Sequence, residues 1–375
     1  MNPTHTHAPE VTEQLERLRE EVRQVDAALV ELIARRLELV EAIGRLKKAH
    51  GVPLRDWSVE KAVVHHALDR ARALRVSEDL VRRVIQLLIE ESRVLQERMH
   101  YTGNATTTES ICIVGGGGQM GQWFAQFFAD QGHRVWLYDV RGPIPGWTCV
   151  PTLEEGLQDA TVALIATPLE VVPQVIRSIA DTEFAGVVCD IASLKSHLQD
   201  AVTEARQRGL RITSIHPMFG PRTRTLTDKV IIVCDCGDPE ATARVMRLFQ
   251  DTAVTLVPLS MVDHDRMIAY ILGLSHFINI LYAALLAGSG WSFEQLQQIG
   301  STTFLSQIAT TETVVRENPD LYFAIQHLNP FTPALYAAID RTLRELVEIV
   351  RNGYREQFRR VMERGRQWLN GDTPV

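Results

Sequence analysis

Closely spaced glycines follow a short apolar segment near the first third of the chain. Ile111–Val114 has the character of a buried strand, and the glycines after it fit the pattern G-x-G-x-x-G before an apolar helical pattern begins. Glycine permits the tight turn and lets a pyrophosphate approach the helix N-terminus, where free N–H groups favour an anion. The pattern predicts a dinucleotide site formed by Gly116, Gly118, Gln119, Met120 and Gly121.

An acidic residue ends the next predicted strand, Arg134–Tyr138. Asp139 lies about 20 residues after the glycine motif begins, where a carboxylate can accept hydrogen bonds from a ribose 2′-hydroxyl. This position favours NAD over NADP. A flexible glycine loop is the alternative interpretation, but the strand, the spacing and the acid together argue against it.

Three polar residues, Thr167, Ser193 and His216, each follow a short apolar segment further along the chain. Ligands of an open α/β sheet bind beyond the carboxyl ends of its strands. We therefore expect these three side chains to converge on the nicotinamide.

The composition excludes several classes of protein. A chain of 375 residues predicts two to three domains, and 39 basic against 46 acidic residues argue against nucleic acid or an anionic membrane as the main partner. Apolar runs are too short for a membrane span, and the polar N-terminus lacks the apolar core of a secretory signal. Five scattered cysteines without zinc-like spacing indicate reduced thiols and no metal site. We expect a cytoplasmic protein.

The chain begins with a long helical pattern. From Val11 to His50, apolar residues recur at spacings of three and four without an internal proline. Such a helix spans roughly 57 Å, so it must pack on another chain or protrude. Pro53 ends it, and two further helices are predicted at Trp57–Leu74 and Ser77–Arg98.

Polar residues on these helices recur at spacings that place them on common faces. The pairs are Arg36 with Lys47, Asp56 with Glu60, and Ser92 with Gln96. Arg19 lies about 100° round the helix from Arg36 and would face elsewhere, toward a partner's site. Spacing alone favours a solvated charged face.

Motifs spread between Arg19 and Gln96 resemble the all-helical chorismate mutase family. They are Leu18–Glu20, Val25-Asp26, Ala34–Leu39, Gly44 with Lys47, Pro53 with Asp56, and Leu88–Ser92 with Gln96. The resemblance implies an intertwined dimer that shares its long first helix. It also implies the rearrangement of chorismate to prephenate in a cage that needs no nucleophile.

The resemblance also assigns roles. Arg36 and Arg19 of the partner subunit would bind carboxylates, Lys47 and Gln96 would face the breaking ether oxygen, and Asp56, Glu60 and Ser92 would surround the ring hydroxyl and the other polar groups. The family usually has an arginine immediately before this glutamate, where this chain has Val59. The departure predicts a slow mutase, an altered substrate, or rescue by a nearby base such as Lys61.

Three motifs in a fixed order resemble the bifunctional chorismate mutase–prephenate dehydrogenase family. Gly116–Gly121, Asp190–Lys195 and His216–Pro221 follow the mutase-like module. The resemblance implies that NAD takes hydride from the prephenate ring carbon that bears the hydroxyl while carbon dioxide leaves. His216 would take the hydroxyl proton, Ser193 would donate a second hydrogen bond, and His264 would contact the substrate.

The carboxyl-terminal region has a helical pattern from about Met261. Helices are predicted from His264, at Phe293–Glu317, at Pro333–Arg351 and at Tyr354–Leu369. The resemblance implies that this region forms a dimer and closes over the substrate. The family's usual arginines are absent at Thr313 and Leu305, and Arg316 lies one turn beyond the first.

The predicted fold is multidomain. It comprises an all-α mutase-type domain (1–101), a linker (102–108), an α/β Rossmann NAD-binding domain (109–258) and an all-α substrate and dimerisation domain (259–375). We expect a homodimer acting on chorismate and prephenate. Two alternatives stay open, namely the same steps on the 4-amino-4-deoxy analogues, or a dehydrogenase whose mutase-like module serves only dimerisation.

Overall fold

The computed structural model describes residues 9–50, 52, 57–101, 108–250 and 252–371. It divides into two compact units. The first contains Met1–Pro151, Pro217–Ile231 and Ala243–Val257, and the second contains Thr152–His216, Ile232–Thr242 and Pro258–Val375. Most of the predicted linker, 102–107, lies outside the described residues.

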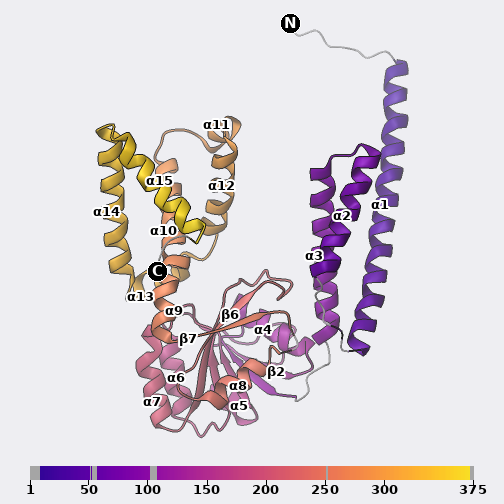
Figure 1. Ribbon diagram of the computed structural model, residues 1–375. Coiled ribbons are helices and arrows are strands. Elements are labelled where there is room, and N and C mark those ends of the chain that lie inside the picture. Colours follow the sequence, from indigo (N-terminus) through magenta and orange to yellow (C-terminus); the bar gives the residue numbers. More distant parts are fainter. Residues whose placement is uncertain (1–8, 51, 53–56, 102–107, 251, 372–375) are drawn as a thin grey trace. The chain divides into compact units, whose positions relative to one another are not determined.

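The amino-terminal bundle contains α1 (Pro9–Ala49), α2 (Trp57–Leu74) and α3 (Glu78–Tyr101). Helix α3 packs against both others, and α1 runs well past their ends (Figure 1). Residues 11–32 of α1 are exposed, including apolar side chains such as Val22 and Val25. This confirms that the long helix protrudes from its own bundle.

The central sheet has seven strands in the order β2-β1-β3-β4-β5-β6-β7. Their bounds are β1 (Ser110–Val114), β2 (Arg134–Tyr138), β3 (Val162–Ile165), β4 (Val187–Asp190), β5 (Arg211–Pro217), β6 (Val230–Cys234) and β7 (Thr255–Leu259). Strand β1 runs parallel to β2 with Ile111 opposite Val135, and β3 and β5 both run parallel to β4. Strands buried on both faces have continuous apolar sequences, which is how the sequence located β1 and the apolar segments before Thr167, Ser193 and His216. No strand was predicted at β7, whose residues are only partly buried or exposed.

Helices follow most of these strands, as in a doubly wound fold, although the described residues between β5 and β6 form no helix. They are α4 (Gln119–Asp130), α5 (Leu153–Gln158), α6 (Val172–Ala180), the short 3₁₀ helix η1 (Ser196–Leu198), α7 (Gln199–Gln207) and α8 (Pro239–Arg247). The buried face of α4 is aromatic. Phe127 stacks on Phe249 with ring centroids 5.6 Å apart, which holds α4 in the core that supports the glycine loop.

The carboxyl-terminal helices differ from the sequence prediction at several points. They are α9 (Met261–Ile268), the π-helical segment η2 (Ala269–Leu274), α10 (Ser275–Ala287), α11 (Phe293–Gln298), α12 (Thr302–Val315), α13 (Pro319–Leu328), α14 (Thr332–Arg351) and α15 (Arg355–Leu369) (Figure 1).

The single helix predicted over residues 293–317 is wrong, because Ser301 caps a new helix at Thr302. Helix α13 lies between two of the predicted helices, in a segment for which no helix was predicted. The Asn318 side chain accepts a hydrogen bond from the Asp320 N–H at 2.9 Å, and Pro319 occupies the first helical position.

One described helical stretch, Met261–Ala287, is long and apolar enough to span a membrane by length and composition. The sequence analysis missed it because polar residues such as Ser275 and Asn279 interrupt its apolar runs. Length and composition are weak evidence, since core helices of soluble proteins meet the same criterion. His264 and Asp265 near its start are fully buried.

Candidate active sites

A buried pair of histidines joins the end of β5 to the first turn of α9. His216 Nδ1 lies 2.9 Å from His264 Nε2, and His264 Nδ1 lies 2.7 Å from Asp265 Oδ1. His216 is only 4% exposed, and His264 and Asp265 are fully buried. The sequence analysis singled out both histidines but missed Asp265, whose only signal is its place beside His264.

The ionisation of Asp265 determines the protonation states of the two histidines that are hydrogen-bonded in series with it. Burial alone would raise the pKa of Asp265, but hydrogen bonds from His264 and from the N–H groups of Ser196 and Lys195 lower it. Those two N–H groups lie 2.7 and 2.9 Å from the carboxylate. Asp265 is therefore ionised and takes the Nδ1–H of His264.

The remaining assignments are determined by that first hydrogen bond. His264 Nε2 carries no proton when the ring is neutral, so it accepts the Nδ1–H of His216. The Nε2 of His216 is then left with its lone pair. Burial, and next the neighbouring His264 and Lys195, hold the pKa of His216 well below its usual 6.5. The arrangement presents a neutral imidazole that can accept a proton.

A buried lysine joins the segment after β4 to the end of β4 and to β5. Lys195 is fully buried, and its Nζ lies 2.9 Å from Asp190 Oδ1 and 2.8 Å from the Ile215 carbonyl. Breaking such a pair leaves an unpaired buried charge, so the contact ties these segments together. Ser193 is half-buried within the segment that this pair holds.

Thr167, two residues after the end of β3, has a buried hydroxyl oxygen with no partner among the described residues. Buried polar atoms are normally hydrogen-bonded, so an orphaned hydroxyl indicates a place for a ligand group.

The glycine loop after β1 has no room for side chains. A Cβ on Gly116 would lie 2.7 Å from Leu137 Cβ, and one on Gly121 would lie 2.6 Å from the Gly115 carbonyl oxygen. Gly115 itself has a φ of +84°. Gly118 precedes α4 with no side-chain cap, so Gln119 and Met120 begin the helix with free N–H groups directed at the loop. This close approach of loop and helix fits a pyrophosphate.

Asp139 lies beside that loop at the end of β2. It accepts a hydrogen bond from the Gly117 N–H at 2.9 Å and forms an ion pair with Arg141 at 3.0 Å. The Arg141 side chain and the backbone N–H groups of Arg141 and Gly117 lower the pKa of Asp139 to about 2, although burial alone would raise it. These residues fit a dinucleotide with a free ribose 2′-hydroxyl. The sequence analysis did not anticipate Arg141, which adds an exposed cation next to this acid.

The bundle encloses a cavity of about 440 Å³. Its lining includes five of the residues predicted for the mutase: Arg36, Lys47, Glu60, Ser92 and Gln96. Arg36 Nη1 donates to Ser92 Oγ at 2.5 Å and to the Leu88 carbonyl at 2.8 Å, and burial lowers the pKa of Arg36. The structure thus brings these five residues together from all three helices.

Two predicted mutase residues are not in this lining. Asp56 lies outside the described residues. Arg19 is exposed on the protruding part of α1, so it does not contribute to the cavity of its own chain.

The same cavity is also lined by Thr227 and Ala253, which the sequence assigned to another domain. Buried Glu97 accepts the N–H groups of Leu226 at 2.8 Å and Thr227 at 3.3 Å. It also accepts the hydroxyl of Thr225. The sequence contains no signal for this contact, because no local feature indicates which distant backbone N–H groups a glutamate on a helix will bind.

The positions where the resemblance led us to look for arginines lie on α12. The Thr313 hydroxyl donates to the Thr310 carbonyl at 2.7 Å, and Leu305 is 40% exposed. Arg316 forms an ion pair with Glu312 at 2.6 Å on an exposed face. Arg316 is thus engaged within its own helix.

Three protein families match the chain in succession. Residues 18–97 match chorismate mutase type II, residues 146–258 match the nucleotide-binding domain of prephenate dehydrogenase, and residues 260–364 match its dimerization domain. The glycine loop and Asp139 precede the second match.

Individual relatives match the chain as well. The T-protein of Enterobacter agglomerans is 28% identical over 356 residues, which cover 95% of this chain and 93% of that protein. A 4-amino-4-deoxyprephenate dehydrogenase of Streptomyces pristinaespiralis is 26% identical over 66% of this chain and 86% of its own length.

A solved structure supports the fold. The prephenate dehydrogenase of A. aeolicus, in complex with hydroxyphenyl propionate and NAD+, aligns with a TM-score of 0.58 and 17% identity. The alignment covers 72% of this chain and all of that one.

Proposed function

Since the chain belongs to the family of bifunctional chorismate mutase–prephenate dehydrogenases, we propose which of its residues carry out the two reactions. The enzyme is an isomerase and an NAD-dependent oxidoreductase of tyrosine biosynthesis. It rearranges chorismate to prephenate and converts prephenate to 4-hydroxyphenylpyruvate. The observation that carries the residue assignment is the buried His216–His264–Asp265 chain.

In the mutase cavity, the residues act by holding one conformer and by stabilising charge. Arg36, braced by Ser92 and the Leu88 carbonyl, binds a carboxylate of chorismate. Lys47 and Gln96 hydrogen-bond the ether oxygen as its bond breaks and negative charge develops there. Arg19 of the partner subunit completes the cage. The carboxylates of Asp56 and Glu60 accept hydrogen bonds from the ring hydroxyl.

In the dehydrogenase, His216 removes the proton from the ring hydroxyl. NAD, when bound, supplies the hydride acceptor. His216 Nε2 accepts the hydroxyl proton as the ring carbon loses hydride and its oxygen becomes a carbonyl. Loss of carbon dioxide then returns an electron pair to that oxygen, and the imidazolium can give the proton back as the phenol forms. His264 and Asp265 stabilise the imidazolium in between.

Ser193 donates a second hydrogen bond to the same substrate oxygen. For the cofactor, Gly116, Gly118 and Gly121 with the N–H groups of Gln119 and Met120 hold the pyrophosphate. Asp139 binds the ribose. The Thr167 hydroxyl, which has no hydrogen-bond partner among the described residues, forms a hydrogen bond with the nicotinamide half of the cofactor.

We further propose a cytoplasmic homodimer with no nucleic-acid or membrane partner. The matched dimerization family and the exposed apolar face of α1 support self-association. The proposed domains are 1–101, 109–258 and 259–375, joined by the linker 102–108.

The deciding experiment supplies the purified enzyme with chorismate and NAD and identifies the product by mass spectrometry. We expect 4-hydroxyphenylpyruvate, carbon dioxide and NADH in equal amounts. If prephenate is oxidised and chorismate is not consumed, the mutase half of the proposal is wrong. Running 4-amino-4-deoxychorismate and its prephenate analogue in parallel tests the amino series, since preference for those substrates would reassign the pathway.

A further inference from the structure

The mutase cavity binds a substrate with two carboxylates and must stabilise further negative charge on an ether oxygen. Such a cavity needs several cations. Position 59 on α2 carries valine, which lines the cavity and is 55% exposed. A cationic group has to reach this side of the cavity from another position.

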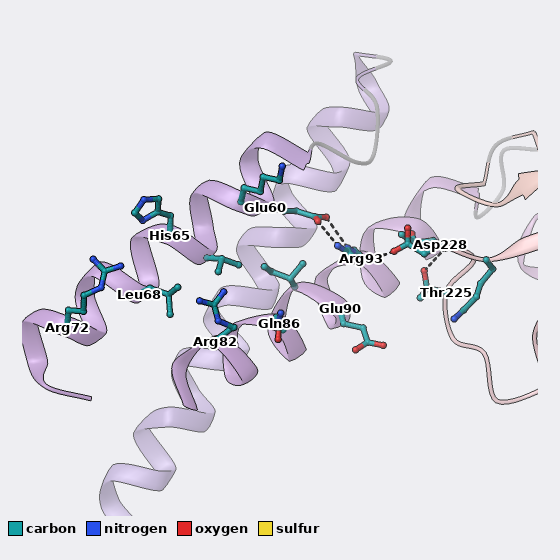
Figure 2. A pocket seen from close by; sticks show the side chains of 15 residues that line it. Glu60, His65, Leu68, Arg72, Arg82, Gln86, Glu90, Arg93, Thr225 and Asp228 are labelled. Atoms are coloured by element: carbon teal, nitrogen blue, oxygen red, sulfur yellow. Dashed lines mark hydrogen bonds and ion pairs between the residues drawn. The ribbon is translucent and has the colours of Figure 1, made fainter. Parts of the chain in front are cut away.

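Arg93, on the facing helix α3, points into this region. Its Nε lies 2.9 Å from Glu60 Oε1, and its Nη2 bonds to Glu60 Oε2, so a bidentate pair joins α3 to α2 (Figure 2). Glu60 is the immediate neighbour of Val59. The guanidinium is therefore anchored next to the position that lacks a charge.

Arg93 also shares a helix face with one of the predicted mutase residues. It precedes Gln96 by three positions, which makes the two side chains neighbours on α3, and Ser92, Arg93 and Gln96 all line the 440 Å³ cavity. A neighbouring cavity of about 730 Å³, drawn in Figure 2, is lined by Arg93 and Glu60 as well. The guanidinium thus stands at the wall between the two, and its side chain is 26% exposed.

The ion pair with Glu60 occupies only some of the N–H donors of the Arg93 guanidinium. Arginine has five N–H donors in a rigid fork, and Glu60 takes one from Nε and one from Nη2. Asp228 approaches Nη1 at 3.4 Å, near the limit of a hydrogen bond. Donors on Nη1 and Nη2 remain for a ligand carboxylate.

We propose that Arg93 is a substrate-binding residue of the mutase, held in place by Glu60, and that it supplies from α3 the positive charge that Val59 does not supply from α2. Its guanidinium binds a carboxylate of chorismate alongside Arg36, while Lys47 hydrogen-bonds the ether oxygen. This inference rests on the mutase half of the proposed function.

The test compares Arg93→Gln, Arg93→Val and the exchange Val59→Arg/Arg93→Val in the full-length enzyme. Arg93→Gln keeps most of the side chain's length and should lower kcat/KM for chorismate by ~10²-fold, the usual effect of removing one charge-stabilising donor. Arg93→Val should lose at least as much. The exchange should regain ten-fold or more over Arg93→Val, because the arginine then stands beside Glu60 on α2.

Two controls separate binding from folding. Oxidation of prephenate, supplied directly, should change by less than about two-fold in every variant. Arg82→Ala removes a cation from the same helix that lines only the neighbouring cavity, so it should leave the mutase unchanged (Figure 2).

Three results would overturn the inference. The first is an Arg93→Gln mutase within two-fold of the parent. The second is a loss that the exchange does not relieve while prephenate oxidation is normal, which would make Arg93 a structural link to Asp228. The third is an equal loss in Arg82→Ala. A parent enzyme that does not rearrange chorismate at all would instead defeat the proposed function.

Discussion

His216 Nδ1 lies 2.9 Å from His264 Nε2, and this one contact determines which nitrogen of His216 can act as a base. Because Asp265 holds the proton of His264 on Nδ1, His216 must donate from its own Nδ1. The lone pair on Nε2 is the group left to meet a substrate hydroxyl.

Replacing this base should slow the dehydrogenase without preventing NAD binding. His216→Asn should lower turnover of prephenate by ~10²–10⁴, the range for a positioned general base. The dissociation constant for NAD, measured by fluorescence titration, should change little. Near-normal turnover in the mutant would show that the base lies elsewhere.

The pH profile of the parent should reflect the lowered pKa of His216. The sequence alone suggested an acid limb near 6.5, but burial, His264 and Lys195 lower the pKa well below that value. The neutral base therefore persists to lower pH, and kcat/KM for prephenate should stay level through pH 6.5 and fall only below it. The limb should vanish in His216→Asn. The same shift costs stability in acid, because the unfolded histidine binds a proton more readily than the folded one.

Asp265 should matter although it is too deeply buried to touch the substrate. Asp265→Asn replaces the ionised acceptor with an amide that can turn its NH₂ toward His264 and reverse the tautomer. We expect turnover to fall by on the order of 10²-fold with little change in KM for prephenate. An unchanged rate, with the mutant folded by circular dichroism, would show that the tautomer of His264 is not determined by this carboxylate.

The cofactor preference should depend on the balance between Asp139 and Arg141. A 2′-phosphate would face the Asp139 carboxylate, so the parent should prefer NAD in kcat/KM. Asp139→Ser should narrow the gap to NADP, since it removes the repulsion and frees Arg141 to meet the phosphate. Arg141→Ala in the same background should widen the gap again. Equal use of both cofactors by the parent would contradict the role given to Asp139.

Exchange of subunits tests whether one mutase site uses two chains. Arg19→Ala and Arg36→Ala should each abolish most mutase activity, and mixing the two proteins should restore part of it. A hybrid dimer can assemble one intact site, because Arg19 is exposed on α1 while Arg36 lines its own cavity. If hybrid dimers form, as native mass spectrometry can show, and no activity returns, each site draws on a single chain.

Glu97 should couple the mutase cavity to the segment after β5. Glu97→Ala leaves buried N–H groups of Leu226 and Thr227 without an acceptor, which costs about 1–3 kcal/mol for each group. We expect faster proteolysis at residues 222–229 and a lower mutase rate, because Thr227 lines that cavity. Glu97→Gln keeps one acceptor oxygen, so its proteolysis rate and its mutase rate should lie between those of the parent and of Glu97→Ala. Unchanged proteolysis in Glu97→Ala would rule out this coupling.

Much of the fold could be read from the sequence because its signals are local. The buried strands are short apolar runs, and the long α1 has an uninterrupted periodicity, so the predicted bounds of β2 and α2 agree with the structure. The break before α12 and the start of α13 were missed, since Ser301 and Asn318 act as caps only when the chain around them turns.

By itself the sequence predicted which residues carry the chemistry, namely the glycine loop, Asp139, His216 and the polar residues of the mutase helices. Residue type, spacing and family resemblance are contained in the chain order. Tertiary structure alone decided how those residues are supported. His216 against His264, Lys195 against the Ile215 carbonyl, Arg93 on Glu60 and Glu97 on residues 225–227 all join segments far apart in the sequence. Ion pairs and buried hydrogen bonds act over about 3 Å, a separation that only the folded chain sets.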